Sequence, residues 1–259
     1  MRDFLVAVRF LTIVPLPGAA LSPDQTIGRS MAYYPLVGLG IGLVLVLARH
    51  LFSFLFPHGV VAILLVVVLI LLTGALHLDG FSDTIDGLRS GKSREEKLRI
   101  MRDSRIGAFG VVGLTCLLIL KFTLLSEIPE GILDRALILM TVLSRWSMVQ
   151  VCCFSVYARS AGGLAKPFVN GVGRRELLPS TAVTVVVALV LLGFKGLIFV
   201  GLNALLNHGI KAFFHRGLGG ITGDVLGATN EVSEVLCLAM ICVMSPWGLD
   251  GFLYPLLMG

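Results

Sequence analysis

Three aspartates stand close together in the segment TGALHLDGFSDTIDGLRSG, residues 73–91, which follows a long aliphatic run. Asp79, Asp83 and Asp86 are spaced i, i+4 and i+7, so on a helix with about 100° per residue they share a sector of roughly 60°. Like charges at this spacing repel, and carboxylates next to hydrocarbon are costly. A divalent cation removes both penalties, and carboxylate oxygens suit Mg²⁺ or Mn²⁺. The segment therefore predicts a site for a divalent metal ion.

Two glycines and a histidine flank these acids. Gly80 and Gly87 leave room for a ligand to approach the backbone, and phosphate oxygens could then complete the shell of the metal. Three acids on one face beside two glycines favour a metal site over ordinary solvated acids at a helix end. His77 is a weaker candidate for a fourth ligand, because it points elsewhere on the same helix and is typical of an interfacial residue.

Three further charges, Arg102, Asp103 and Arg105, stand in RDSRIGAFG, residues 102–110, at the start of the next apolar segment. Charges that enter hydrocarbon need a partner, and phosphate with its metal supplies one for Asp103 and Arg105. We therefore expect both residues in the site. The alternative is a solvated amphipathic helix with i,i+4 ion pairs, which explains most of residues 90–102.

A second cluster, HRGLGGITGDVLGATNE, covers residues 215–231. Its glycines, Gly220 and Gly223 among them, form a loop before an apolar segment, where exposed backbone N–H groups can hold phosphate. Asp224 and Glu231 are seven residues apart and share one helix face. A charge such as Glu231 inside a membrane segment suggests a functional role. We expect Asp224 to bind metal and the other three residues to contact substrate.

Arg145 lies in the middle of an apolar segment, beside a tryptophan. An unpaired arginine there is expensive, so it should face the interior of the bundle and meet an acid or an anionic substrate. We expect it to offset charge on a phosphate. The alternative is a structural ion pair with Asp224 or Glu231.

These residues must be positioned by membrane helices. The chain has 259 residues, of which 56% are hydrophobic and 14% charged, whereas soluble domains carry about 25% charged residues. This composition predicts an all-α integral membrane protein that forms a single catalytic domain, residues 1–259. The Lys and Arg residues behind the net charge of +5 are gathered in a few loops. In a membrane protein this distribution indicates the topology and contacts with lipid headgroups, and it does not indicate binding of nucleic acid.

Hydrophobic runs predict about seven transmembrane helices after an N-terminal interfacial or re-entrant helix that Pro15 and Pro17 end. The expected spans are residues 31–56, 60–78, 106–125, 135–156, 177–193, 197–214 and 225–244, and the expected polar segments are 79–105, 157–176 and 211–224. A single long helix from 177 to about 206 is the alternative to the fifth and sixth spans. Seven spans place the three basic polar segments on one face, which is cytoplasmic by the positive-inside rule.

The motifs HLDGFSDTIDGL, MRDSRIGAFG and GGITGDVLGATNE, with the N-terminal RFLTIVPLP, resemble the cobalamin synthase family, the adenosylcobinamide-GDP ribazoletransferases of the bacterial and archaeal inner membrane. The resemblance covers residues 9–231. It implies a multi-pass, Mg²⁺-dependent phosphotransferase of cobalamin biosynthesis with its active site facing the cytosol. The substrates it implies are adenosylcobinamide-GDP and α-ribazole or its 5′-phosphate, with release of GMP. A homo-oligomer is compatible with the sequence.

The acidic motif is also similar to that of the CDP-alcohol phosphotransferases, which opens Asp-x-x-Asp-Gly. Residues 83–87 match that opening, but the Ala-Arg pair expected next falls on Ser90 and Gly91, and no downstream Asp-x-x-x-Asp follows. The resemblance thus implies metal binding by Asp83 and Asp86, with Asp79 or Asp224. It supplies no general base, because the downstream pair is missing, and Asp79 and Asp103 are the candidates for that role. A lipid-synthesising CDP-alcohol transferase and a membrane transporter remain as alternative functions.

We predict that Asp83→Asn and Asp86→Asn each abolish turnover in membranes, because an amide binds Mg²⁺ far more weakly than a carboxylate. The measurement is product formation by membranes that contain each variant at the same protein level as the wild type. Full activity of either variant would contradict the assignment of that residue as a metal ligand.

Overall fold

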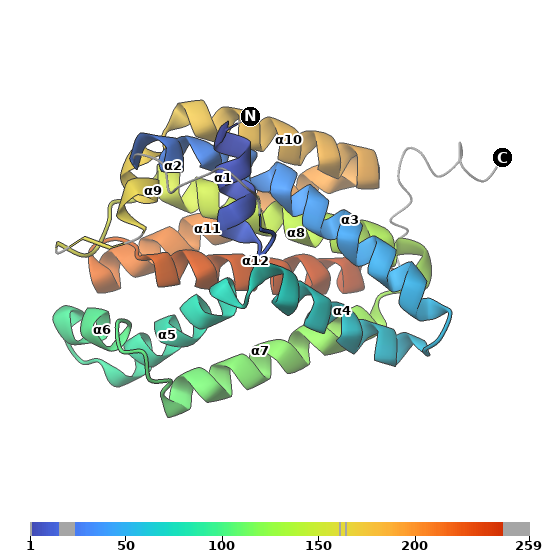
Figure 1. Ribbon diagram of the computed structural model, residues 1–259, viewed down its shortest axis with the longest axis horizontal. Helices are drawn as coiled ribbons and strands as arrows, with labels where there is room; N and C mark the ends of the chain where they lie inside the picture. The colour runs from blue at the N-terminus through green and yellow to red at the C-terminus, as the bar shows by residue number, and fades with distance from the viewer. Residues whose placement is uncertain (1, 16–23, 161, 164, 246–259) are drawn as a thin grey trace.

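The computed structural model describes residues 2–15, 24–160, 162–163 and 165–245 (Figure 1). This part of the chain is helical apart from loops and one isolated bridge between Tyr157 and Ile221. Its long helices are α3 (Tyr34–Ser53), α4 (His58–Thr73), α5 (Leu76–Ser90), α7 (Ala108–Glu127), α8 (Glu130–Cys153), α10 (Arg174–Leu192), α11 (Gly196–Leu218) and α12 (Gly223–Met244). The short ones are α1 (Arg2–Leu11), α2 (Asp24–Ser30), η1 (Met31–Tyr33), α6 (Arg94–Ile100), α9 (Lys166–Gly171) and η2 (Gly193–Lys195).

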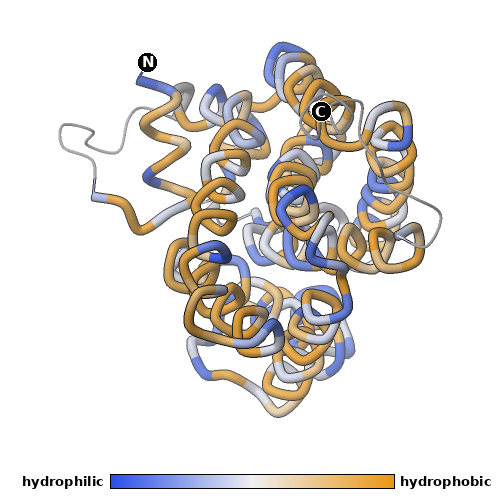
Figure 2. The backbone as a smooth tube through the Cα atoms, turned by 90° about the vertical axis from the view of Figure 1, so that its right-hand side faces the viewer, coloured by the Kyte–Doolittle hydropathy of each residue, from blue (hydrophilic) through white to orange (hydrophobic). Residues whose placement is uncertain are grey.

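The expected all-α membrane bundle is confirmed. Within the described residues, five helical stretches are long and apolar enough to cross a membrane, or up to six if α4 and α5 form one broken span. That count takes α10 and α11 together as one stretch. Hydrophobic residues dominate the helices in Figure 2, and many large apolar side chains on α3, α4, α7 and α11 are exposed on the outside of the bundle.

The fifth and sixth predicted spans form a hairpin, and the alternative of one long helix is wrong. Gly193 leaves helical geometry with φ +59°, and η2 turns the chain. A Cβ atom on Gly196 would collide with the carbonyl of Ala188. Eight residues would separate these two positions by about 12 Å along one helix, so α10 and α11 must lie against each other.

The predicted boundary of the second span at Leu78 is wrong, and the polar segment predicted for residues 79–105 is mostly helical. Helix α4 ends at Thr73, because Gly74 and Ala75 both adopt left-handed conformations, with φ of +60° and +57°. The next helix, α5, leaves at an angle of 92° to α4. The three aspartates therefore stand on a helix separate from α4, in agreement with their spacing, and α6 follows where an amphipathic helix was the alternative.

The N-terminal helix is also present. Helix α1 buries Ala7 and Leu11, and the backbone N–H of Ile13 donates to the carbonyl of Leu72 at 2.8 Å. The predicted stop at Pro17 lies outside the described residues.

Helix α8 is the centre of the bundle. All of its residues from Leu139 to Val149 are buried, and α3, α10, α11 and α12 pack around it (Figure 1). Helix α3 approaches α8 closely at Gly38, where an added Cβ atom would collide with the carbonyl of Thr141. Gly40, in contrast, has open space around it.

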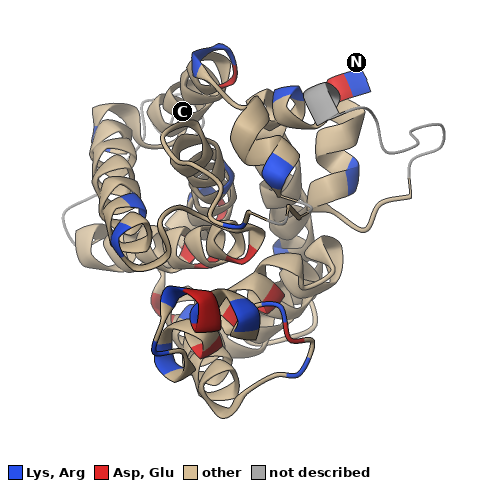
Figure 3. Ribbon diagram, turned by 90° about the vertical axis from the view of Figure 1, so that its left-hand side faces the viewer, with Lys and Arg blue, Asp and Glu red and all other residues tan. Residues whose placement is uncertain are grey.

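The three basic polar segments meet at one end of the bundle, as predicted. Arg94 of α6 donates through Nε to the carbonyl of Leu218 and through a terminal nitrogen to the carbonyl of Ala158, both at 2.7 Å. Figure 3 looks onto this end, where charged residues gather on α5 and α6. One arginine thus joins the end of α11, the loop after α8 and the start of α6.

We predict that Gly38→Leu destabilises the bundle while Gly40→Leu does not. The side chain on residue 38 must force α3 away from α8, and overpacking of this kind costs about 1–3 kcal/mol or more. Thermal unfolding of the purified protein in detergent should show a melting temperature several degrees lower for Gly38→Leu. Equal melting temperatures for the two variants would contradict the described α3–α8 contact.

Candidate active site

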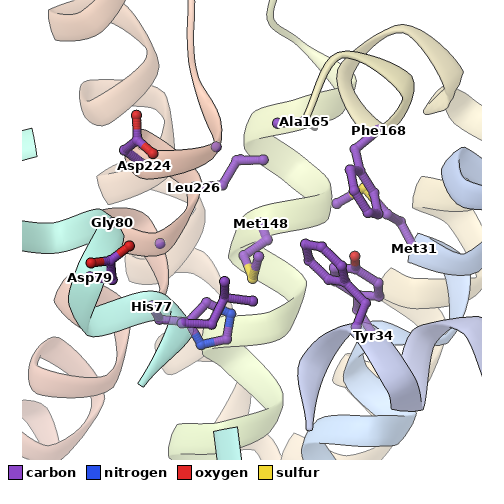
Figure 4. Close-up of a pocket in the computed structure, with 14 residues that line it drawn as sticks. Met31, Tyr34, His77, Asp79, Gly80, Met148, Ala165, Phe168, Asp224 and Leu226 are labelled. Atoms are coloured by element: carbon purple, nitrogen blue, oxygen red, sulfur yellow. The ribbon is translucent and has the colours of Figure 1, made fainter. Parts of the chain in front are cut away.

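Two glycines bring the acid-bearing helices α5 and α12 together. A Cβ on Gly80 would lie 3.0 Å from the Cα of Asp224, and a Cβ on Gly227 would lie 3.0 Å from the carbonyl oxygen of His77. Because neither residue carries a side chain, the two backbones approach closely. Asp79 and Asp224, which are far apart in sequence, therefore lie on the same side of one cavity (Figure 4).

The acids form a region of negative charge that is only partly compensated. Asp83 is half-buried, and the carboxylates of Asp79, Asp224 and Asp86 all repel its charge. Arg159 donates to the Asp224 carboxylate at 2.8 Å and is the cation that attracts Asp83. From the sequence, Arg159 was expected only as part of the basic loop, since nothing in its local sequence indicates an acid on a distant helix.

Asp86 also has a structural role. The residue is 6% exposed, and its carboxylate accepts from the backbone N–H of Gly107 at 2.8 Å and of Gly110 at 2.9 Å. These N–H groups belong to the start of α7, which has no intrahelical acceptors for them. Asp86 therefore fastens α5 to α7, and its assignment as a metal ligand stays a prediction.

The donor set fits Mg²⁺ only together with a substrate. No group of three His, Cys, Asp or Glu side chains among the described residues is arranged to hold a metal by itself. Mg²⁺ in phosphoryl-transfer sites is usually bound by one or two carboxylates, with phosphate oxygens and water in the other positions. Asp79 and Asp83, one helical turn apart on α5, can supply such a pair.

Asp103 and Arg105 lie apart from this cavity. They form an exposed ion pair at 2.8 Å, and the Arg105 side chain is 87% exposed. The hydrogen bonds from Arg105 lower the pKa of Asp103 to about 2. Asp79 lines the cavity whereas Asp103 does not, so the placement favours Asp79 over Asp103 as the base.

The predicted glycines separate into two groups. A Cβ on Gly87 would collide with Met101, and one on Gly220 would collide with the carbonyl of Val156, so both glycines serve close packing of the polar end. Gly223 begins α12 behind the N-cap Thr222, and it lines the cavity beside Asp224.

Arg145 and Glu231 belong to a buried charge network between α7, α8 and α12. Arg145 is fully buried and donates to Glu234, so it forms the structural ion pair of the alternative expectation, but with an acid that the sequence patterns did not single out. Lys121 donates to both Glu231 and Glu234 at 2.6 Å. The signal that could have found this network is its spacing, because Glu231 and Glu234 are three residues apart on one helix and face an intramembrane lysine.

The cavity has a volume of about 220 Å³. Asp79 and Asp224 line one side of it, Met31, Tyr34 and Phe168 line the opposite side, and Met148 of α8 lies between them (Figure 4). His77 also lines the cavity and is 2% exposed, and neither of its ring nitrogens has a hydrogen-bond partner among the described residues. The arrangement offers carboxylates for a cation or a proton beside an apolar space for part of a substrate.

We predict that Glu234→Leu strongly destabilises the protein, because it leaves the charges of Arg145 and Lys121 short of a buried partner. Removing one member of a buried ion pair costs about 3–5 kcal/mol. The matched control is Glu130→Gln, whose side chain is 72% exposed and whose replacement should cost about 1 kcal/mol or less. The measurement is thermal unfolding in detergent, and equal shifts for the two variants would refute the structural role of the network.

Comparisons with known proteins identify the family of this chain. The profile of a family described as Cobalamin-5-phosphate synthase matches residues 3–242. A protein of Geotalea daltonii named adenosylcobinamide-GDP ribazoletransferase is 41% identical over 238 residues, which are 92% of this chain and 96% of the relative. Its namesake in Acetivibrio thermocellus is 39% identical over 240 residues, 93% of this chain and 97% of the relative. No solved structure matches the chain. With nearly its whole length matched, this chain belongs to the Cobalamin-5-phosphate synthase family.

Proposed function

We propose that this protein is an adenosylcobinamide-GDP ribazoletransferase, which joins adenosylcobinamide-GDP to α-ribazole or its 5′-phosphate and releases GMP. Family membership over residues 3–242 supports the reaction. The observation that carries the placement of the site is the acid-lined cavity between α5 and α12, which holds Asp79 and Asp224. Helices able to span a membrane support an integral membrane enzyme. The basic polar end of the bundle then faces the cytosol of a bacterial or archaeal cell.

The reaction is a substitution at phosphorus. A hydroxyl oxygen of ribazole forms a bond to the phosphorus attached to cobinamide, and the bond from that phosphorus to the oxygen of GMP breaks. GMP leaves with the bonding electron pair, and the hydroxyl proton passes to a carboxylate. Asp79 is the base that the geometry favours, because it lines the cavity and is more exposed than Asp224, whose charge Arg159 already pairs.

We further propose Mg²⁺ as the cofactor, held by Asp79 and Asp83 with Asp224 or Asp86 nearby. The support is electrostatic, since a diphosphate would be repelled by four carboxylates that one arginine only partly offsets. A bound Mg²⁺ neutralises charge on the diphosphate and on the leaving phosphate. Holding the metal and taking the proton are different tasks, so Asp79 as base and Asp79 as ligand are alternatives, and Asp83 is the ligand common to both.

A product assay tests the proposal with purified full-length protein, adenosylcobinamide-GDP and α-ribazole. We expect GMP and a cobalamin product with Mg²⁺ and neither with a chelator. Loss of a catalytic base typically lowers the rate by about 10²–10⁴-fold, so Asp79→Asn should reduce kcat by at least that lower factor, whereas Asp103→Asn should not.

The matched control is Glu95→Gln, an exposed acid on α6, which should keep wild-type activity. Formation of no GMP by the wild-type protein would refute the proposed function. A larger loss in Asp103→Asn than in Asp79→Asn would instead reject only the assignment of the base, and activity in the presence of chelator would reject only the metal.

A further inference from the structure

The cavity wall opposite the acids is aromatic. Phe10 of α1 stacks on Tyr34 of α3 with ring centroids 6.3 Å apart and an angle of 17° between the rings. Phe10 also packs against Phe168 of α9, with centroids 4.4 Å apart. Tyr34 and Phe168 are buried, and all three rings line the cavity. Flat rings from three separate helices make a surface suited to a planar apolar group.

His77 gives this cavity an unused hydrogen-bonding group. The residue is 2% exposed, and both of its ring nitrogens lack a hydrogen-bond partner among the described residues. In Figure 4 the ring lies at the edge of the cavity. A neutral imidazole donates from one nitrogen and accepts at the other. Unpaired buried polar atoms are unfavourable, so a ligand that pairs them gains binding energy.

The size of the cavity selects between the two substrates of the proposed reaction. No Lys or Arg stands among the described residues that line it, whereas Asp79 and Asp224 do, so a diphosphate would enter only together with the proposed Mg²⁺. A volume of about 220 Å³ is small for a corrin ring with its side chains. A planar nucleoside fits this limit and needs no cation to enter.

We propose that this cavity binds the aromatic base of the nucleoside acceptor, α-ribazole, an inference that rests on the proposed function. The base packs against Phe10, Tyr34 and Phe168, and His77 hydrogen-bonds to the base or its ribose. The ribose then points to the side of the cavity that carries Asp79 and Asp224. This places the attacking hydroxyl beside the carboxylates and leaves adenosylcobinamide-GDP outside, at the polar end.

Kinetics of the purified full-length protein test the inference through two variants. Phe168→Leu keeps an apolar side chain but removes the flat ring, and His77→Ala removes the free nitrogens. Removal of one stacking ring or one hydrogen-bonding group corresponds to roughly a tenfold change in affinity, so the KM for α-ribazole should rise about tenfold in each variant. The KM for adenosylcobinamide-GDP should stay within about twofold, because that substrate does not enter the cavity.

The matched controls are Phe194→Leu, at a ring that is 85% exposed beyond the end of α10, and His208→Ala, at an exposed histidine on α11. Neither should change either KM. A second measurement uses the wild-type protein and does not depend on folding of a variant. The free aromatic base of α-ribazole should inhibit competitively against α-ribazole and not against adenosylcobinamide-GDP.

Three results would overturn the inference while the proposed function stands. They are an unchanged KM for α-ribazole in both folded variants, a rise confined to the KM for adenosylcobinamide-GDP, and inhibition by the free base that is not competitive with α-ribazole. If the wild-type protein releases no GMP from these substrates, the proposed function fails first, and this inference fails with it.

Discussion

The close crossing of α5 and α12 is the constraint on which the site depends. Gly80 and Gly227 let the two backbones approach, and this contact alone brings Asp79 beside Asp224. The bend at Gly74 and Ala75 is what makes the crossing available. Without it, α4 would continue straight and carry the acids away from α12. The left-handed turn at these two residues thus ends α4 and lets α5 carry its aspartates to α12.

The charges buried inside the bundle and the charges at its polar end are compensated to different extents. In the interior, Lys121 and Arg145 are matched by Glu231 and Glu234, and the network ties α7, α8 and α12 together. At the polar end, the aspartates of α5 and α12 outnumber the arginine that meets them. Balanced buried charge is structural, whereas excess negative charge at an accessible cavity is suited to a cation and a phosphate. His77 stands between the two regions, since it lines the cavity and interacts electrostatically with Arg145 and Glu234.

Sequence patterns predicted the helical class, the positions of the apolar helices and the hairpin near residue 195, because long hydrophobic runs and basic loops act locally. They did not predict the break after Thr73. The aliphatic run continues in composition through Leu76 and Leu78, and the left-handed Ala75 has no local signal. Arg145 was expected inside the bundle, but its partner could not be selected, since three acids on α12 were available and only packing decided that Glu234 faces it.

The sequence by itself determined a membrane protein with acids on one face of α5, because composition and helical periodicity are properties of the chain alone. Its motifs also indicated the family. Only the tertiary structure decided what each acid does. Asp86 turned toward the start of α7, Asp224 met Arg159, and Asp79 was left facing a cavity with aromatic residues on its far side. These outcomes depend on helices that are distant in sequence and on the space that glycines leave between them, and no local pattern encodes such distances.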